Sequence, residues 1–175
     1  GYGGIYQKDL SFEMYWEDNQ DKYDRFTSLL YQSDYLFISS NRQWGTTTRV
    51  PERYPLTTKF YQALLGCPTV EDLYYCYSTA NPGTYKGNLG YELVQVFESY
   101  PTIGNFEIND QFADEAFTVY DHPKVLIFKK STNYDPVKVS QILGEVDLSK
   151  VLFYTPGEFP DYPADLMLPE SQEKI

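Results

Sequence analysis

The sequence predicts an α/β fold, a single domain in which helices pack on a mixed sheet. Three observations support this: residues 125–128 form an uninterrupted apolar run, residues 10–39 follow a strand–helix–strand pattern, and later segments carry proline and glycine at helix ends. A chain of 175 residues is long enough for one domain with a substantial core. The expected divisions are a flexible start, the α/β domain and an extended C-terminal strap, at residues 1–8, 9–150 and 151–175.

The first three elements are predicted to form a βαβ unit. Residues 10–16 alternate apolar and polar side chains, as a strand with one buried face does. The acidic stretch at residues 17–21 supplies a cap for a helix that runs to about Gln32, and its apolar residues form one stripe. A strand at residues 35–39 follows at once. Elements of these lengths predict a parallel pair of strands with a right-handed crossover.

Long connections separate the elements in the middle of the chain. Residues 40–52 show neither a helical nor a strand period, so we expect a long connection there. A helix at residues 56–65 follows Pro55 and stops at Gly66. The next segments are predicted to be an irregular insertion, a strand and an acidic loop, at residues 66–90, 91–100 and 107–115.

A β-hairpin is predicted to anchor the sheet. Its arms, residues 117–121 and 124–129, are rich in β-branched and aromatic side chains, and Pro123 belongs to the connection because it cannot donate a ladder hydrogen bond. The second arm has no polar position from 125 to 128, which predicts a central strand covered on both faces. A short helix is expected next, at residues 137–143, with Asp135 and Pro136 as its cap and first turn.

The charge balance excludes two classes of partner. The chain has 14 basic and 25 acidic residues, and its net charge is −11. Nucleic acids and anionic membrane surfaces both require clustered Lys and Arg, so neither is an expected partner. No window approaches the ~18–20 apolar residues that span a bilayer, and the start lacks the pattern of a signal peptide. We therefore expect a soluble piece of protein.

Motifs for catalysis, metals and cofactors are lacking. The neighbours Asp121 and His122 are the one acid–histidine pair, and adjacent residues normally point apart, so His122 is expected to be a turn residue whose ring caps backbone groups. With a single His, no Cys/His set for zinc exists. A solvated loop is the simplest expectation for the acidic side chains that could otherwise bind calcium, which are Glu107, Asp110, Asp114 and Glu115. We predict no catalytic residue, metal or cofactor.

Three arginines stand out in so acidic a chain. Arg42, Arg49 and Arg53 fall within one predicted connection, which leaves the second strand and leads to the helix at Pro55. Guanidinium groups suit bidentate recognition of phosphate or carboxylate. The simpler expectation is that they pair with internal acids and brace the connection. The alternative is a ligand-binding site for an anion, to which we add the neighbouring Tyr54.

Several blocks of the chain resemble one known family. The sequence is similar to the soluble portion of multi-span membrane proteins described as family-39-like glycosyltransferases, which are relatives of dolichyl-phosphate-mannose protein mannosyltransferases. The resemblance covers most of residues 9–169 and is weakest in the insertion at 66–90. The blocks that carry it are Ser39-Ser40-Asn41-Arg42, Arg53-Tyr54-Pro55-Leu56-Thr57-Thr58, Gly90-Tyr91-Glu92-Leu93-Val94 and the predicted hairpin from Phe117 to Lys130.

The resemblance implies an extracytoplasmic domain between transmembrane helices of a parent protein that transfers sugar from a polyprenyl-phosphate donor. Catalytic acids of that family lie near its first membrane helices, and nothing in this chain matches them. The chain itself is therefore expected to be non-catalytic. Its implied partners are the transmembrane portion of the same protein and, at the arginines, a lipid-linked sugar phosphate or a glycan or protein acceptor.

Two further points remain open. Cys67 and Cys76 are either two buried thiols or a small disulfide loop, and the extracytoplasmic location that the resemblance implies favours the disulfide. The alternative function is a free-standing extracytoplasmic module that binds carbohydrate or protein, in which some of the 18 Tyr and 2 Trp stack on sugar rings.

Overall fold

A three-stranded antiparallel sheet lies at the centre of the fold. The computed structural model describes residues 10–113, 118–120 and 122–153. The strands are β1 (Tyr35–Ile38), β5 (Val125–Lys130) and β2 (Tyr91–Phe97), in the spatial order β1-β5-β2. The predicted central position of the apolar run at 125–128 is therefore confirmed, as are the α/β class and the single domain.

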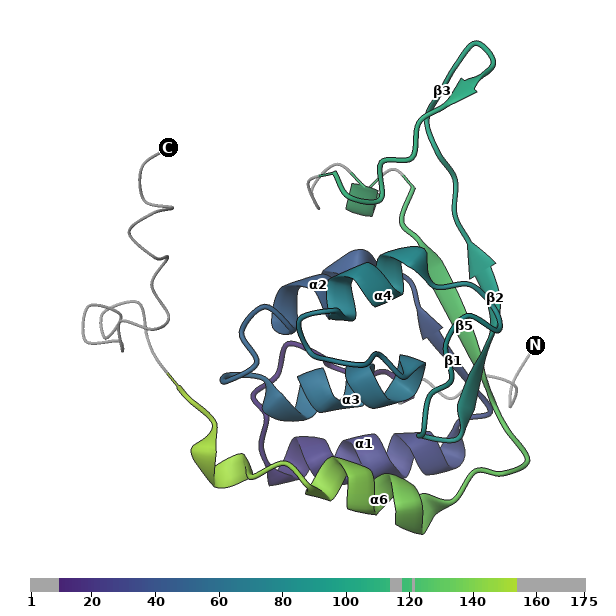
Figure 1. Cartoon of the computed structure of the whole chain (residues 1–175). Coiled ribbons are helices and arrows are strands. Elements are labelled where there is room, and N and C mark those ends of the chain that lie inside the picture. Colours follow the sequence, from purple (N-terminus) through teal and green to yellow (C-terminus); the bar gives the residue numbers. More distant parts are fainter. Residues whose placement is uncertain (1–9, 114–117, 121, 154–175) are drawn as a thin grey trace, which may run out of the picture.

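The helices cover one face of this sheet (Figure 1). Towards one end of the molecule lie α2 and α4, at the other end lie α1 and α6, and α3 lies between them. The bounds of these helices are α1 Gln20–Gln32, α2 Asn41–Thr47, α3 Pro55–Leu65, α4 Leu73–Thr79 and α6 Pro136–Gly144, with a final 3-10 turn at Leu148–Lys150. The core forms where the apolar stripes of the helices meet Leu36, Leu126 and Phe128 of the sheet.

No helix or strand of the described residues covers the opposite face of the sheet, which corrects the expectation that the central strand is covered on both sides. Burial alternates along β5: Leu126 and Phe128 are buried, whereas Val125 and Ile127 are half-buried. Phe37, the β1 partner of Ile127, is exposed. The continuous apolar run therefore predicted the central position of the strand correctly, but it did not predict the burial of both faces.

Helices with strong local signals lie where the sequence predicts them. Asn19 caps α1 by accepting a hydrogen bond from Lys22 N, and Asp135 caps α6 in the same way. Pro55 begins α3, and Gly66 ends it in the left-handed conformation, with φ of 88°. An alanine Cβ at Gly66 would meet the carbonyl oxygen of Lys86 at 2.2 Å, so the site needs glycine twice over.

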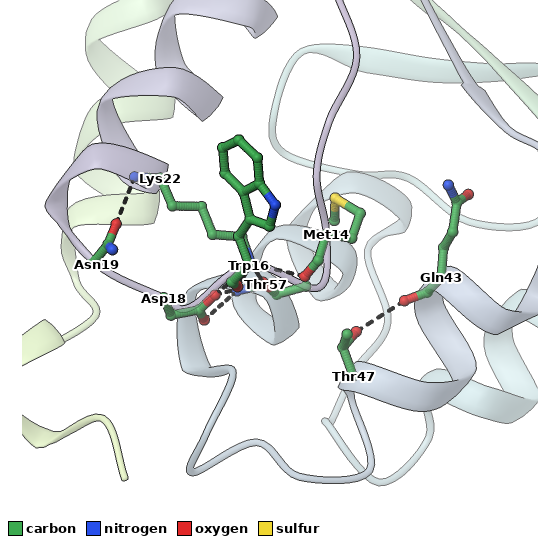
Figure 2. Close-up of polar contacts among 8 residues, drawn as sticks. All are labelled: Met14, Trp16, Asp18, Asn19, Lys22, Gln43, Thr47 and Thr57. Atoms are coloured by element: carbon green, nitrogen blue, oxygen red, sulfur yellow. Dashed lines mark hydrogen bonds and ion pairs between the residues drawn. The ribbon is translucent and has the colours of Figure 1, made fainter. Parts of the chain in front are cut away.

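Residues 10–16 do not form the predicted strand, because their carbonyl groups bind a buried lysine (Figure 2). Lys22 Nζ lies 2.8 Å from the carbonyl oxygen of Met14 and 2.7 Å from that of Trp16. It also contacts Asp18 and Thr57, at 2.7 and 2.6 Å. No βαβ unit or parallel pair exists among the described residues, and β1 pairs antiparallel with β5 instead.

Asp18 links this network to α3. Its two carboxylate oxygens accept hydrogen bonds from the backbone N–H of Thr57, at 2.9 Å, and from the Thr57 hydroxyl, at 2.7 Å. Thr57 lies in the first turn of α3, where backbone N–H groups lack partners within the helix. Tyr54, the N-cap residue, makes no side-chain cap bond. Asp18 therefore caps α3 from a distant part of the chain.

The predicted hairpin is wrong in its first arm. Residues 118–120 are helical, whereas β5 exchanges ladder bonds with β1 and β2. Thr118 is buried and accepts a hydrogen bond of 2.7 Å from Asn41. Phe117 and Asp121 lie outside the described residues, as do the expected flexible start at 1–8 and the strap beyond residue 153. Contacts with distant elements therefore overrode the β propensity of this arm.

Two connections contain helices that the sequence analysis missed. The long connection at 40–52 includes α2, which Ser40 caps through a 3.2 Å hydrogen bond from Arg42 N. The insertion at 66–90 includes α4. Both helices are short, so their apolar residues give too few turns for a periodic signal. The third predicted strand ends at Phe97, earlier than expected.

A small hairpin projects from the body of the molecule beyond β2 (Figure 1). It consists of β3 (Thr102–Ile103) and β4 (Phe106–Glu107), joined through Gly104, which has a φ of 64°. Within the described part of the chain, no helix combines the length and the apolar character needed to cross a membrane.

Candidate functional site

A cavity of about 970 Å³ opens between α2, α4 and the segment that follows the projecting hairpin. Its volume is in the range of small-molecule sites, ~300–1,000 Å³. Helix α2 and the residues after it contribute Arg42 and Arg49, and α4 and the loop before it contribute Tyr74 and Glu71. Phe112, Ala113, Val119 and Tyr120 form the remaining wall.

Trp44 packs helix α2 against α4, and Arg42 in this helix and Arg49 just after it line the cavity. The Trp44 ring is buried and stacks on Tyr77, with centroids 5.3 Å apart, and meets Tyr74 at 5.2 Å. Arg42 lies in the first turn of α2, and Arg49 follows the C-cap residue Thr48. Both side chains are exposed at the cavity.

Aromatic rings line the wall opposite α2. Phe112 is exposed and lies 6.4 Å from the Tyr74 ring and 6.3 Å from the stacked Tyr75 ring. Tyr120 is also exposed, and its hydroxyl lies 3.5 Å from Arg42 Nη1. Rings of this kind offer flat faces to a sugar, while the hydroxyl and guanidinium groups offer hydrogen bonds.

The described part of the cavity lining is more basic than the chain as a whole. It contains two guanidinium groups, those of Arg42 and Arg49, and one carboxylate, that of Glu71. Hydrogen bonds from its own backbone N–H and from the Thr69 hydroxyl lower the pKa of Glu71, so this residue is ionised at neutral pH. The described lining therefore carries a net positive charge in a chain whose net charge is −11. Such a wall favours a ligand with a negatively charged group.

The structure brings together only part of the predicted binding set. Arg42 and Arg49 share the cavity, whereas neither Arg53 nor Tyr54 lines it. The Arg53 guanidinium lies 5.7 Å from the centre of the Tyr54 ring, beside the start of α3. Lys22 Nζ lies over the same ring at 5.5 Å. Tyr54 thus belongs to the buried network at α3, and Arg53 stacks on it.

The two cysteines are free, buried thiols in the structure. Burial, and after it a hydrogen bond with the Cys76 thiol, raises the pKa of Cys67. The two sulfur atoms are therefore neighbours, although they are not bonded here. The sequence left two alternatives open, a pair of buried thiols or a disulfide. The structure contains the buried thiols, and formation of a disulfide stays a prediction.

A buried acid–histidine pair lies behind the cavity wall, and the sequence analysis missed it. His122 Nε2 is 2.6 Å from Asp110 Oδ2, and the two side chains are 8% and 9% exposed. His122 was expected to cap backbone groups and Asp110 to lie in a solvated loop. Because the partners are 12 positions apart in the chain, no spacing rule could have joined them.

Lys124 forms a second buried contact beside this pair. Its Nζ donates to the Ser78 carbonyl oxygen at 2.7 Å and lies 3.2 Å from Glu98 Oε2. Burial lowers the pKa of Lys124, and the neighbouring Glu98 opposes that shift. None of these titratable side chains is among the described residues that line the cavity.

Metal binding has no support in the described part of the chain, where no group of three or more His, Cys, Asp or Glu side chains is placed to hold an ion. In comparisons with known proteins, no family model, no curated protein sequence and no solved structure matches this chain. The geometry of the cavity is therefore the basis for interpreting the site.

Proposed function

We propose that this chain is the non-catalytic, ligand-binding domain of a membrane-embedded glycosyltransferase, located on the extracytoplasmic face. In this proposal the cavity between α2 and α4 receives the sugar-phosphate head group of a polyprenyl-phosphate donor. The transmembrane portion of the same protein carries out the transfer. The sequence resemblance is the source of the enzyme class, and the cavity is the source of the ligand chemistry.

The observation that carries the proposal is the convergence of Arg42 and Arg49 on one cavity with aromatic walls. A sugar phosphate needs both kinds of group: guanidinium N–H donors for the phosphate oxygens, and ring faces for the apolar side of the sugar. Tyr120 and Phe112 supply exposed rings within the same lining. The acidic remainder of the surface would repel an anion elsewhere and leave this wall as its preferred contact.

The test is binding of a hexose 1-phosphate to the chain, measured by titration calorimetry at low and moderate salt. We expect the double variant Arg42→Gln/Arg49→Gln to bind at least about tenfold more weakly, the effect of losing charge-assisted hydrogen bonds. Arg53→Gln is the matched control, because Arg53 is equally an exposed arginine but does not line the cavity. Thermal melts of all three proteins should agree.

Equal loss of affinity in Arg53→Gln and in the double variant would overturn the cavity as the binding site. So would binding that is unchanged in the double variant. A loss of melting temperature in Arg42→Gln/Arg49→Gln would support the simpler expectation that these arginines brace the segment.

The second candidate function is a free-standing module that binds neutral carbohydrate or protein. The exposed rings of Tyr75, Phe112 and Tyr120 favour it, because stacking on a sugar needs no phosphate. Binding of the unphosphorylated hexose with the same affinity as the hexose 1-phosphate would favour this candidate. Many hydrophobic spans flanking the chain in the parent reading frame would favour the transferase proposal.

A further inference from the structure

The turn of the projecting hairpin carries exposed apolar side chains and belongs to a segment, residues 99–106, without charge. Ile103 and Phe106 are cross-strand partners beside the turn, and they are 69% and 79% exposed. Ile108, which follows β4, is exposed as well. From Ser99 to Phe106 the chain has no charged residue, although charged residues make up 22% of the whole. Water solvates such a tip poorly, so the tip favours an apolar environment.

We call residues 98–110 the arm. Its two ends are fixed to the body of the molecule. Its first residue, Glu98, lies 3.2 Å from Lys124, and its last, Asp110, lies 2.6 Å from His122. Lys124 and His122 flank Pro123 immediately before β5. An isolated two-stranded hairpin is marginally stable in water. Two polar contacts, one at each end of the arm, therefore hold the arm away from the core, and its apolar side chains remain exposed.

We infer that this arm inserts its tip, Ile103 and Phe106, into the interfacial region of a lipid bilayer. A narrow, convex turn without charge needs no complementary groove, which suits a fluid interface better than a folded protein surface. The acidic residues Glu98 and Glu107 bracket the uncharged segment, and the chain has a net charge of −11. The surface must then be zwitterionic, because an anionic one would repel this arm.

The arm also leads directly to the cavity. Phe112 and Ala113, which line it, follow Ile108 within a few residues. Figure 1 shows the arm projecting at the end of the molecule where α2 and α4 lie, away from α1 and α6. Insertion of the tip therefore places the end of the molecule that carries α2 and α4 nearest to the bilayer. This inference rests on the apolar arm, and it does not require the cavity to bind a sugar phosphate.

The test uses the 175-residue chain and sedimentation with vesicles of phosphatidylcholine. We expect the chain to sediment with them, and Ile103→Ser/Phe106→Ser to partition at least about tenfold more weakly, since burying each such side chain favours partition by one to two powers of ten. The matched control is Phe37→Ser/Val137→Ser, which removes apolar side chains that are 65% and 63% exposed on other elements. Adding anionic lipid should weaken the binding of every variant.

Three results would overturn the inference: no sedimentation of the unmodified chain, equal losses in the tip and control variants, or stronger binding as anionic lipid is added. Light scattering measures the oligomeric state. A dimer that Ile103→Ser/Phe106→Ser abolishes would also overturn the inference, because the arm would then mediate self-association. Affinity for hexose 1-phosphate should not change in Ile103→Ser/Phe106→Ser, so failure of lipid binding and failure of the cavity proposal remain distinguishable.

Discussion

The imidazole of His122 and the carboxylate of Asp110 are 2.6 Å apart and almost fully buried, although the two residues are 12 positions apart in the chain. Asp110 ends the projecting arm, and His122 precedes the central strand β5. One hydrogen bond therefore fixes both ends of the segment that contributes the outer wall of the cavity. Loss of either partner should affect the position of that wall as well as global stability.

Replacing His122 with Gln should lower the free energy of unfolding by about 1–3 kcal/mol, because the Asp110 carboxylate stays buried with a weaker partner or none. Urea denaturation at neutral pH measures the change. The double variant Asp110→Asn/His122→Gln tests the pairing: we expect it to cost less than the sum of the two single changes. Strict additivity would mean that the two groups do not stabilise each other.

Replacing Asp18 with Ala should be among the most destabilising single changes, at about 3–5 kcal/mol, since it leaves Lys22 buried without its counter-ion. It also removes the cap of α3 at Thr57. Chemical denaturation gives the magnitude. The variant Asp147→Ala is a suitable control, because Asp147 caps an exposed turn and pairs with the exposed Lys150. We expect that control to lose much less stability, because exposed ion pairs are screened by water.

Alkaline pH should destabilise the fold through its buried tyrosines. Burial raises the pKa of Tyr61, Tyr77 and Tyr91 above 10.0 in the folded state. An unfolded tyrosine therefore releases its proton near pH 10, while the folded one retains it, so the stabilisation is complete below pH 10 and is lost as pH rises above it. Each such tyrosine contributes a slope of about 1.4 kcal/mol per pH unit.

Urea denaturation between pH 9 and about 11.5 would show this slope. The variant Tyr77→Phe should have a shallower slope than the unmodified chain, while its stability at pH 8 falls by about 1 kcal/mol through the lost hydrogen bond to Tyr61 O. Lys22 and Lys124 act in the opposite direction. Burial lowers their pKa, so the unfolded state binds more protons below pH 10.5 and stability rises with pH there. Comparing variants at each pH removes this common background.

Two glycines separate the cost of backbone strain from the cost of a clash. Gly66 and Gly83 both have positive φ, of 88° and 84°, but an added Cβ meets backbone at Gly66 and nothing within 4 Å at Gly83. Gly83→Ala should therefore cost about 1–2 kcal/mol. Gly66→Ala should cost about 1–3 kcal/mol more, since Lys86 would have to move. If thermal or urea denaturation gave equal losses of stability for the two variants, the close contact between Gly66 and the backbone of Lys86 would be contradicted.

The thiols of Cys67 and Cys76 should react slowly with an aromatic disulfide reagent in the native protein, since both are buried and burial raises the pKa of Cys67. Fast labelling in the native state would contradict this. Mass spectrometry after unfolding, with and without reductant, tests the predicted disulfide. A protein secreted into an oxidising compartment should lack the mass of two hydrogen atoms if the pair is bonded.

Local chemistry was enough to predict α1, α3 and α6. A cap side chain, a proline at the first turn or a glycine at the end acts within a few residues, so Asn19, Pro55 and Asp135 mark the same positions in the sequence and in the fold. The apolar run in β5 likewise predicted a central strand. The strands that pair with β5 could not be predicted, because they lie far away in the chain. The hairpin expected between residues 117 and 129 paired β5 with the segment nearest in sequence, whereas β5 pairs with β1 and β2.

The sequence by itself determined which residue types were available for a site, and it singled out the arginines in an acidic chain. Only the tertiary structure decided which of them share a cavity. Arg42, in α2, and Arg49, just after it, both line the cavity, while Arg53 lies beyond Pro51 and stacks on Tyr54. The same applies to Lys22, whose contacts with Met14 and Trp16 prevent a strand, and to His122, whose partner is Asp110. The physical reason is that a buried polar group takes the partner that folding brings within about 3 Å, and nearness along the chain does not determine that partner.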